Sequence, residues 1–133
     1  MRPNIETFIG CDAAYEDAKI VLFGAPFDST TSFRPGARFG PAAMRHESFG
    51  LETYSPYQDK DLTDLSIFDC GDLELCFGSA EAALSDIERR ADELLDDGKL
   101  PVLLGGEHLV TLGAVRAVAK PPSLPVRWLA PPT

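Results

Sequence analysis

Apolar residues are concentrated in three short runs that predict buried β-strands. The runs are AKIVLFGAP (18–26), LSIFDCGDLEL (65–75) and LPVLLGG (100–106). The first run, 18–26, is continuously apolar, which is typical of a strand buried on both faces of a parallel sheet. Each run gives way to glycine, proline or acidic residues, so we expect a loop at the carboxyl end of each strand.

The segments that follow these runs have helical spacing. Residues 79–97 predict the clearest helix, with Ser79 as its N-cap and a glycine after its last turn. PAAMRHESFG predicts a shorter helix that begins at Pro41. Residues 109–119 predict a third helix, apolar on nearly all sides, as expected of a helix packed inside a larger body. The apolar positions of the clearest helix are Ala83, Leu84, Ile87, Ala91, Leu94 and Leu95.

Strand and helix alternate three times, which predicts an α/β fold with a parallel sheet and right-handed crossovers. About three β-α units make a small, incomplete sheet. Residues 121–133, PPSLPVRWLAPPT, contain five prolines and no periodicity, and proline disfavours both helices and central strands. We therefore expect 1–120 to be folded and 121–133 to be an irregular proline-rich tail.

Charge and hydropathy exclude several classes of function. The chain has 21 acidic and 12 basic residues, a formal net charge of -9, whereas binding to nucleic acid needs clustered Lys and Arg. No apolar run approaches the roughly 20 residues of a membrane helix. The first ten residues, MRPNIETFIG, lack the apolar stretch of a secretory signal. We expect a cytoplasmic protein with no nucleic-acid or membrane partner.

The cysteines predict neither a disulfide framework nor a zinc site. Cys11, Cys70 and Cys76 are an odd number at irregular spacing, without a CxxC pair. We expect them to be buried structural thiols.

Three polar segments follow the predicted strands: FDSTTSFRPGARFG (27–40), DCGDLEL (69–75) and GGEH (105–108). The carboxyl ends of parallel strands share one rim, where ligands bind in open α/β sheets. His108 is expected at this rim. Its alternative roles are a metal ligand, a general base and a packed, hydrogen-bonded histidine. His46, between Arg45 and Glu47, is expected to be a surface histidine.

Two further interpretations of this rim receive less support. The glycine-rich segments do not match either phosphate-binding motif, G-x-x-x-x-G-K-[ST] or G-x-G-x-x-G, and Glu107 would repel an anion. Asp69, Asp72 and Glu74 could bind a metal, but acids at strand ends more often accept hydrogen bonds from nearby backbone amides.

Taken in order, GAPFDSTTSFRPGARFGPAAMRHES, DCGDL and LPVLLGGEHLVTLG resemble the N-terminal part of the ureohydrolase (arginase/agmatinase) family, most closely the agmatinases. The likeness covers about residues 4–120. It implies an arginase-like three-layer α/β/α fold and two manganese ions bridged by hydroxide. Such enzymes hydrolyse a guanidinium group to urea and an amine, and agmatinases make putrescine from agmatine.

The resemblance assigns His108 as a ligand of one manganese ion, because this residue matches the histidine of the family's GG[DE]H motif. It also places Arg34, Gly36 and Arg38 in a loop that shapes the substrate entrance, although loop geometry and surface ion pairing explain these residues equally well. The family's other ligands, in D-A-H-x-D and D-x-D motifs, are absent, and an early frameshift or truncated reading frame would explain the proline-rich tail. No catalytic or substrate-binding acid is identified in this chain.

The resulting prediction separates the intact enzyme from the chain of 133 residues. We expect the intact enzyme to be a homo-oligomer that acts on a small cationic guanidino substrate with manganese, and this chain alone to bind metal weakly and to be inactive. One alternative is a ureohydrolase acting on arginine or another guanidino acid. The other is a non-catalytic interaction module that joins a partner through an exposed sheet edge.

Overall fold

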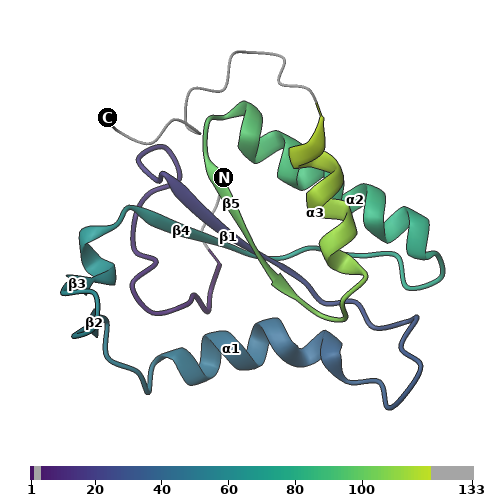
Figure 1. Cartoon of the computed structure of the whole chain (residues 1–133), viewed down its shortest axis with the longest axis horizontal. Helices are drawn as coiled ribbons and strands as arrows, with labels where there is room; N and C mark the ends of the chain where they lie inside the picture. The colour runs from purple at the N-terminus through teal and green to yellow at the C-terminus, as the bar shows by residue number, and fades with distance from the viewer. Residues whose placement is uncertain (2–3, 121–133) are drawn as a thin grey trace.

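A computed structural model of the protein describes residue 1 and residues 4–120, so the predicted tail at 121–133 lies outside the described residues. The elements alternate as the sequence predicts, with a small hairpin inserted before the second long strand (Figure 1). They are β1 (Ile20–Ala25), η1 (Ala37–Phe39), α1 (Gly40–Ser48), β2 (Tyr54–Ser55), β3 (Lys60–Asp61), η2 (Leu62–Asp64), β4 (Ile67–Asp72), α2 (Ala80–Asp96), β5 (Leu100–Gly105) and α3 (Val110–Ala119).

The three long strands form a parallel sheet in the order β4-β1-β5. β1 pairs with β5 along its whole length, from Ile20 opposite Leu100 to Ala25 opposite Gly105. Its pairing with β4 is regular up to Leu22 and then shifts. The sequence-based prediction of an incomplete parallel α/β sheet is therefore confirmed, and all three strand ends point to the same rim.

Side chains on one face of the sheet pack against α2 and α3. In β1, Val21, Phe23 and Ala25 point to this face, and all are fully buried. α2 contributes the apolar stripe that its sequence predicts, and its N-cap is confirmed, because the Ser79 hydroxyl accepts a hydrogen bond from the Ala82 amide. This face holds the larger hydrophobic core.

The opposite face is covered by α1 and by the N-terminal segment, which completes three layers (Figure 1). Leu22 and Ile67 pack here with Cys11, and Leu104 borders the cluster. The continuous apolar run of β1 is thus explained by burial on both faces. β5 is less completely covered, because Leu100 is 49% exposed and Val102 is 37% exposed.

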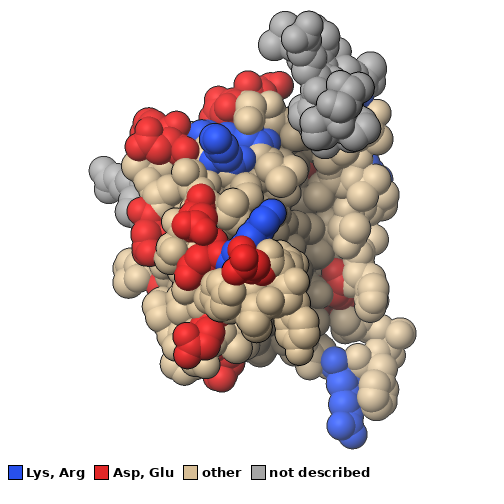
Figure 2. Space-filling view, turned by 60° about the vertical axis from the view of Figure 1, so that its left-hand side comes forward, with Lys and Arg blue, Asp and Glu red and all other residues tan. Residues whose placement is uncertain are grey.

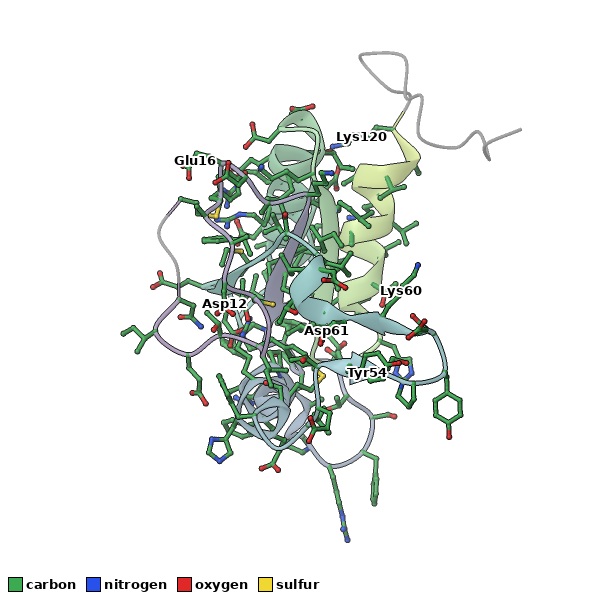
Figure 3. The ribbon with its side chains drawn as sticks, turned by 90° about the vertical axis from the view of Figure 1, so that its left-hand side faces the viewer. Asp12, Glu16, Tyr54, Lys60, Asp61 and Lys120 are labelled. Carbon is green, nitrogen blue, oxygen red and sulfur yellow. The ribbon has the colours of Figure 1, made fainter. Side chains whose placement is uncertain are left out.

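The N-terminal segment also pairs with the outer edge of β4. The Ala13 amide donates a hydrogen bond to the Ile67 carbonyl at 3.2 Å, and Asp12 forms an antiparallel bridge with Phe68. Figure 3, which labels Asp12, shows this segment on the side of the molecule that carries β4. This pairing is not predicted by the sequence, since residues 4–13 have no strand pattern.

Acidic side chains are spread over the surface, in keeping with the net charge of -9 (Figure 2). Among the described residues, no helix is both long and apolar enough to cross a bilayer. Ion pairs with Lys and Arg offset part of the acidic charge, including several along α2.

Candidate active-site rim

The turn after β5 lies directly against the loop after β1. The Gly106 amide donates to the Ala25 carbonyl at 3.1 Å, and the Glu107 amide donates to the Phe27 carbonyl at 2.9 Å. A Cβ atom on Gly106 would lie 2.1 Å from the Phe27 carbonyl oxygen. The second glycine of the Gly-Gly step is therefore required by the close approach of two backbones.

The carboxylate of Glu107 fixes the same two segments through its side chain. Its Oε1 atom accepts hydrogen bonds from the Thr30 amide at 3.1 Å and from the Thr30 hydroxyl at 2.7 Å. The sequence pattern predicted for Glu107 only a charge that repels anions. In the structure it joins the loop after β1 to the residue preceding His108.

Asp28 organises the rest of this loop. Its buried carboxylate accepts hydrogen bonds from the backbone amides of Gly36 at 2.6 Å and Arg38 at 3.3 Å. The Arg38 Nε atom lies 2.9 and 3.1 Å from the two carboxylate oxygens. Burial alone would raise the pKa of Asp28, but these hydrogen bonds and the Arg38 charge together lower it below its ordinary value. This role of Asp28 was not predicted, although an aspartate that follows a strand in a glycine-rich loop is a known turn signal.

The loop residues assigned by resemblance have different local roles. Gly36 has a φ of +142°, a region that favours glycine, and begins the 3-10 helix η1. Arg38 pairs with Asp28 as described, so ion pairing explains its position. Arg34 has a φ of +36° and its guanidinium lies 5.2 Å from the centre of the neighbouring Phe33 ring.

The segment after β4 reaches the rim through Phe77. Its ring stacks on buried Phe27 with centroids 5.9 Å apart, and the Arg38 guanidinium lies 5.4 Å from its centre. The loops that follow the three strands therefore meet around the loop after β1, although Phe77 lies just beyond the predicted segment 69–75. The part played by Phe77 carries no signal in the sequence, because an isolated aromatic residue in a loop has no periodicity.

His108 is exposed at this rim and faces a shallow hollow of about 250 Å³. The hollow is bounded on one side by the turn after β5 and on the other by the loop after β1, and its lining includes two charged or titratable groups, Glu107 and His108. An exposed imidazole in a hollow can bind a ligand, which favours the site interpretation over that of a packed core histidine. The full lining is Thr30, Thr31, Ser32, Phe33, Glu107, His108 and Leu109.

Two acids predicted at the end of β4 hold α1 against the sheet. Asp69 is fully buried and accepts two hydrogen bonds from the Arg45 guanidinium, at 2.8 and 3.0 Å. It also accepts from the backbone amides of Phe8 and Gly71. Asp72 accepts from a third Arg45 nitrogen at 2.5 Å. Burial lowers the pKa of Arg45, but the hydrogen bonds and charges of the two acids outweigh it, so the net pKa is raised.

This network supports a structural role for Asp69 and Asp72, as the sequence analysis favours. The buried state of Arg45, whose side chain is 3% exposed, is a finding that the sequence did not predict. His46 is on the surface as predicted, and its Nδ1 atom lies 3.4 Å from the Glu6 carboxylate. No described contact assigns a role to Glu74.

The prediction of three buried thiols is only partly right. Cys11 is buried, and burial raises the pKa of its thiol to about 12. Cys70 is half-buried, whereas Cys76 is exposed. Cys76 belongs to the loop beyond β4, which leaves the sheet before α2 begins and so has no core to enter.

A larger hollow of about 310 Å³ lies elsewhere, beneath the β2–β3 hairpin. Its lining includes Lys60 and Asp61, which Figure 3 labels on the projecting hairpin. None of its lining residues comes from the three loops of the rim. Its size alone does not make it the candidate site, because it lacks an imidazole or thiolate and does not lie at the carboxyl ends of the long strands.

A metal centre is not complete within the described part of the chain. No three His, Cys, Asp or Glu side chains among residues 1 and 4–120 lie close enough to share an ion. His108 supplies one nitrogen donor, while the Oε1 atom of Glu107 is occupied by Thr30. These residues therefore do not fit a dinuclear metal site by themselves.

Comparison with known proteins gives consistent matches. Residues 18–129 match the model of the Arginase family. The agmatinase of Bacillus anthracis is 48% identical over 115 residues, which make up 86% of this chain and 40% of that enzyme. The chain thus spans about two fifths of the length of this curated relative.

Solved structures have the same fold. The agmatine ureohydrolase of Thermoplasma volcanium superposes with a TM-score of 0.80 at 37% identity, over 86% of this chain and 39% of that one. A formiminoglutamase from Trypanosoma cruzi, solved with Mn²⁺, has a TM-score of 0.69 at 29% identity, over 81% of this chain and 38% of that one.

Proposed function

The chain belongs to the arginase family, and on that premise we propose that it forms the first three β-α units of an enzyme that hydrolyses agmatine to urea and putrescine. The observation that carries this proposal is the 48% identity to an agmatinase across 86% of the chain. The match includes all three loops of the rim and the turn that carries His108. An enzyme of this family is a hydrolase, which favours this function over a non-catalytic interaction module.

We infer that His108 is one ligand of a manganese centre whose other ligands lie outside the described residues. A manganese-bound relative of the same fold supports the choice of metal. When bound, such ions lower the pKa of water and supply a nucleophile for a guanidinium carbon that neutral water attacks slowly. The donor set of the described residues is too small for that chemistry, so we propose that this chain alone is inactive and binds Mn²⁺ weakly.

The residues of this chain then have positioning roles. The hydrogen bonds of Glu107 with Thr30 hold the loop after β1 beside the imidazole of His108. Asp28 keeps the next part of the loop in one conformation through the amides of Gly36 and Arg38. We propose that this loop forms one wall of the substrate entrance. The acidic surface of the chain favours a cationic substrate such as agmatine.

The test uses a chimera in which residues 1–120 replace the matching segment of the Bacillus anthracis agmatinase. With Mn²⁺, we expect the chimera to release urea and putrescine from agmatine. We expect His108→Ala to reduce turnover by about a hundredfold and His46→Ala, the matched surface control, to leave it unchanged. A chimera that folds and binds Mn²⁺ but releases no urea would overturn the proposal.

The 133-residue chain is assayed in parallel. We expect no urea release in excess Mn²⁺, and isothermal titration calorimetry should detect only weak Mn²⁺ binding that His108→Ala removes. Urea release by the chain alone, lost in His108→Ala, would contradict its proposed inactivity.

A different guanidino substrate is the second candidate. The formiminoglutamase match indicates that this fold accepts other amidine-type groups. Relative rates with agmatine, arginine and guanidinobutyrate in the chimera decide between them, and a rate for another substrate above that for agmatine would replace the assignment. A cytoplasmic location and homo-oligomerisation stay predictions.

A further inference from the structure

A β-bulge in β4 places two acids on the same face of the sheet. Leu22 of β1 lies opposite Asp69. Two residues further on, Gly24 lies opposite Asp72, so two steps along β1 correspond to three along β4. Gly71 lies within the bulge and has a φ of +78°, in the left-handed region that favours glycine. Side chains alternate between faces along a regular strand, which would separate Asp69 from Asp72, whereas the bulge brings both to the face that α1 covers.

Asp72 lies in a narrow space between β1 and α1. A Cβ atom on Gly24 would lie 1.8 Å from the Oδ1 atom of Asp72 and 3.1 Å from Cβ of Pro41. A side chain at position 24 would therefore displace the carboxylate. Pro41 and Arg45 are four residues apart and share one face of α1, and the Arg45 guanidinium donates to the same Oδ1 atom at 2.5 Å. Asp72 thus lies where β1, β4 and α1 meet.

Neutralisation of Arg45 does not require Asp72. Asp69 carries a full negative charge, is completely buried and accepts hydrogen bonds from two nitrogens of the guanidinium. The Asp72 side chain is 33% exposed, so solvent screens its ion pair, and water can replace it at the third nitrogen. What Asp72 adds is orientation, because a planar guanidinium with carboxylates at both ends is held in one position.

The first residue of α1 contacts the turn that carries His108. A Cβ atom on Gly40 would lie 3.1 Å from the carbonyl oxygen of Gly105, so the helix backbone lies against the first glycine of the Gly-Gly step. α1 runs along one face of the sheet, with this end beside the end of β5 (Figure 1). On its other side, the turn is bonded to the loop after β1 through the amides of Gly106 and Glu107. The turn therefore has two supports, and one of them moves with α1.

We propose that Asp72 is a positioning residue for the turn that carries His108. Its hydrogen bond with Arg45 fixes the orientation of α1, and α1 in turn holds Gly40 against Gly105. The bulge in β4 makes this bond possible, because it turns the Asp72 side chain toward α1. The effect of Asp72 on turnover rests on the proposed function, whereas its effect on the turn does not.

The first experiment measures amide hydrogen exchange by nuclear magnetic resonance in the full 133-residue chain. Asp72→Ala should speed exchange of the Gly106 and Glu107 amides about tenfold, because the turn opens more often without its support from α1. Amides in the middle of β1 should keep their rates. Asp72→Asn should restore exchange to within about twofold, since the amide oxygen can still accept the hydrogen bond from Arg45.

Asp86→Ala is the matched control. The Asp86 side chain is also 33% exposed and also pairs with an arginine, Arg89, but on α2. Both alanine variants should melt within about 4 °C of the unsubstituted chain, because each loses a partly exposed ion pair. Only Asp72→Ala should change the exchange of the turn, which separates positioning from a general contribution to stability.

The second experiment places the same substitutions in the chimera described above. At saturating agmatine, Asp72→Ala should lower turnover about tenfold, because small displacements of a site are costly. Asp72→Asn should recover most of this loss, and Asp86→Ala should have no effect. An unsubstituted chimera that is folded but inactive contradicts the proposed function, and the exchange measurement then decides this inference alone.

Three results would overturn the proposal. One is equal exchange of the turn amides in Asp72→Ala and Asp86→Ala. Another is faster exchange throughout β1 to the same degree as in the turn, which would make Asp72 a general stabilising residue. The third is an Asp72→Asn variant that behaves like Asp72→Ala, which would assign the effect to the charge of Asp72 and not to its hydrogen bond with Arg45.

Discussion

The β4 edge of the sheet is paired with the N-terminal segment, whereas the β5 edge has no partner among residues 1 and 4–120. On the β4 side, the buried guanidinium of Arg45 is held by the buried carboxylate of Asp69 and by the more exposed carboxylate of Asp72. On the β5 side, the exposed positions are apolar. The outer edge of β4 is therefore stabilised by a segment of this chain, whereas no described residue pairs with the outer edge of β5.

Breaking the buried ion pair on the β4 side should have the largest effect. Arg45→Met leaves the fully buried carboxylate of Asp69 without its counter-charge, which costs about 3–5 kcal/mol in the free energy of unfolding. Urea unfolding measures this loss. The control is Arg89→Met on α2, whose exposed pair with Asp86 should be worth at most about 1 kcal/mol. Equal losses for both variants would contradict the contrast between the two sides.

A substitution at the contact between α2 and α3 tests how tightly these two helices pack on their face of the sheet. A Cβ atom on Gly113 would lie 2.8 Å from Cβ of Ile87, so Gly113→Ala should cost about 1–3 kcal/mol through overpacking. Gly78 has no atom within 4 Å of such a Cβ, and Gly78→Ala is the control that should be nearly neutral. Thermal unfolding followed by circular dichroism compares them. A neutral Gly113→Ala would mean that α3 is held loosely.

The link between the two loops of the rim should have a smaller and more local effect. Glu107→Gln weakens two charge-assisted hydrogen bonds with Thr30, an effect of about 1 kcal/mol at this partly exposed site. Hydrogen exchange of the Thr30 amide should then be about fivefold faster, while β1 and β4 stay unchanged. Glu81→Gln, which loses one surface pair with Arg116, is the control. Unchanged exchange at Thr30 would show that the backbone contacts of the turn suffice.

The smallest effect is expected on acidification. The pKa of Asp28 is lower in the folded chain than the ordinary value of about 4. Its stabilising effect is therefore present above that ordinary value and is lost as the pH falls through the lower, folded value. Limited proteolysis of residues 28–38 should increase in this acidic range. Asp28→Asn should remove this pH dependence. Asp61→Asn is the control, because hydrogen bonds from Thr63 also lower the pKa of Asp61 in the hairpin, and this substitution should leave the pH dependence at residues 28–38 in place.

The main elements of the fold were predictable because they depend on local patterns. The stripe of α2, its cap at Ser79 and the central strand β1 bury the residues that the hydrophobic pattern assigns to the core. The β2–β3 hairpin was not predicted, because strands of two residues have no measurable periodicity. An unpaired edge was expected of an incomplete sheet, but the apolar run of β5 did not reveal that Leu100 and Val102 would be exposed there.

The candidate site was predictable in outline and not in its internal contacts. The position of His108 followed from the strand ending and the Gly-Gly step. The bonds from Glu107 to Thr30 span 77 positions, and those from Arg45 to Asp69 span 24, so neither has a local signature. Arginine is almost never fully buried unless it is paired, and the pairing becomes visible only once the fold brings the partners together.

The pairing of the N-terminal segment with β4 has a consequence for the order of synthesis. On the ribosome, residues emerge from the N-terminus onward. Residues 12 and 13 and all of β1 are therefore available when β4 leaves the exit tunnel, and that side of the sheet can close before β5 emerges. β5 then adds to the free edge of β1, so this part of the nascent sheet grows away from its own N-terminus.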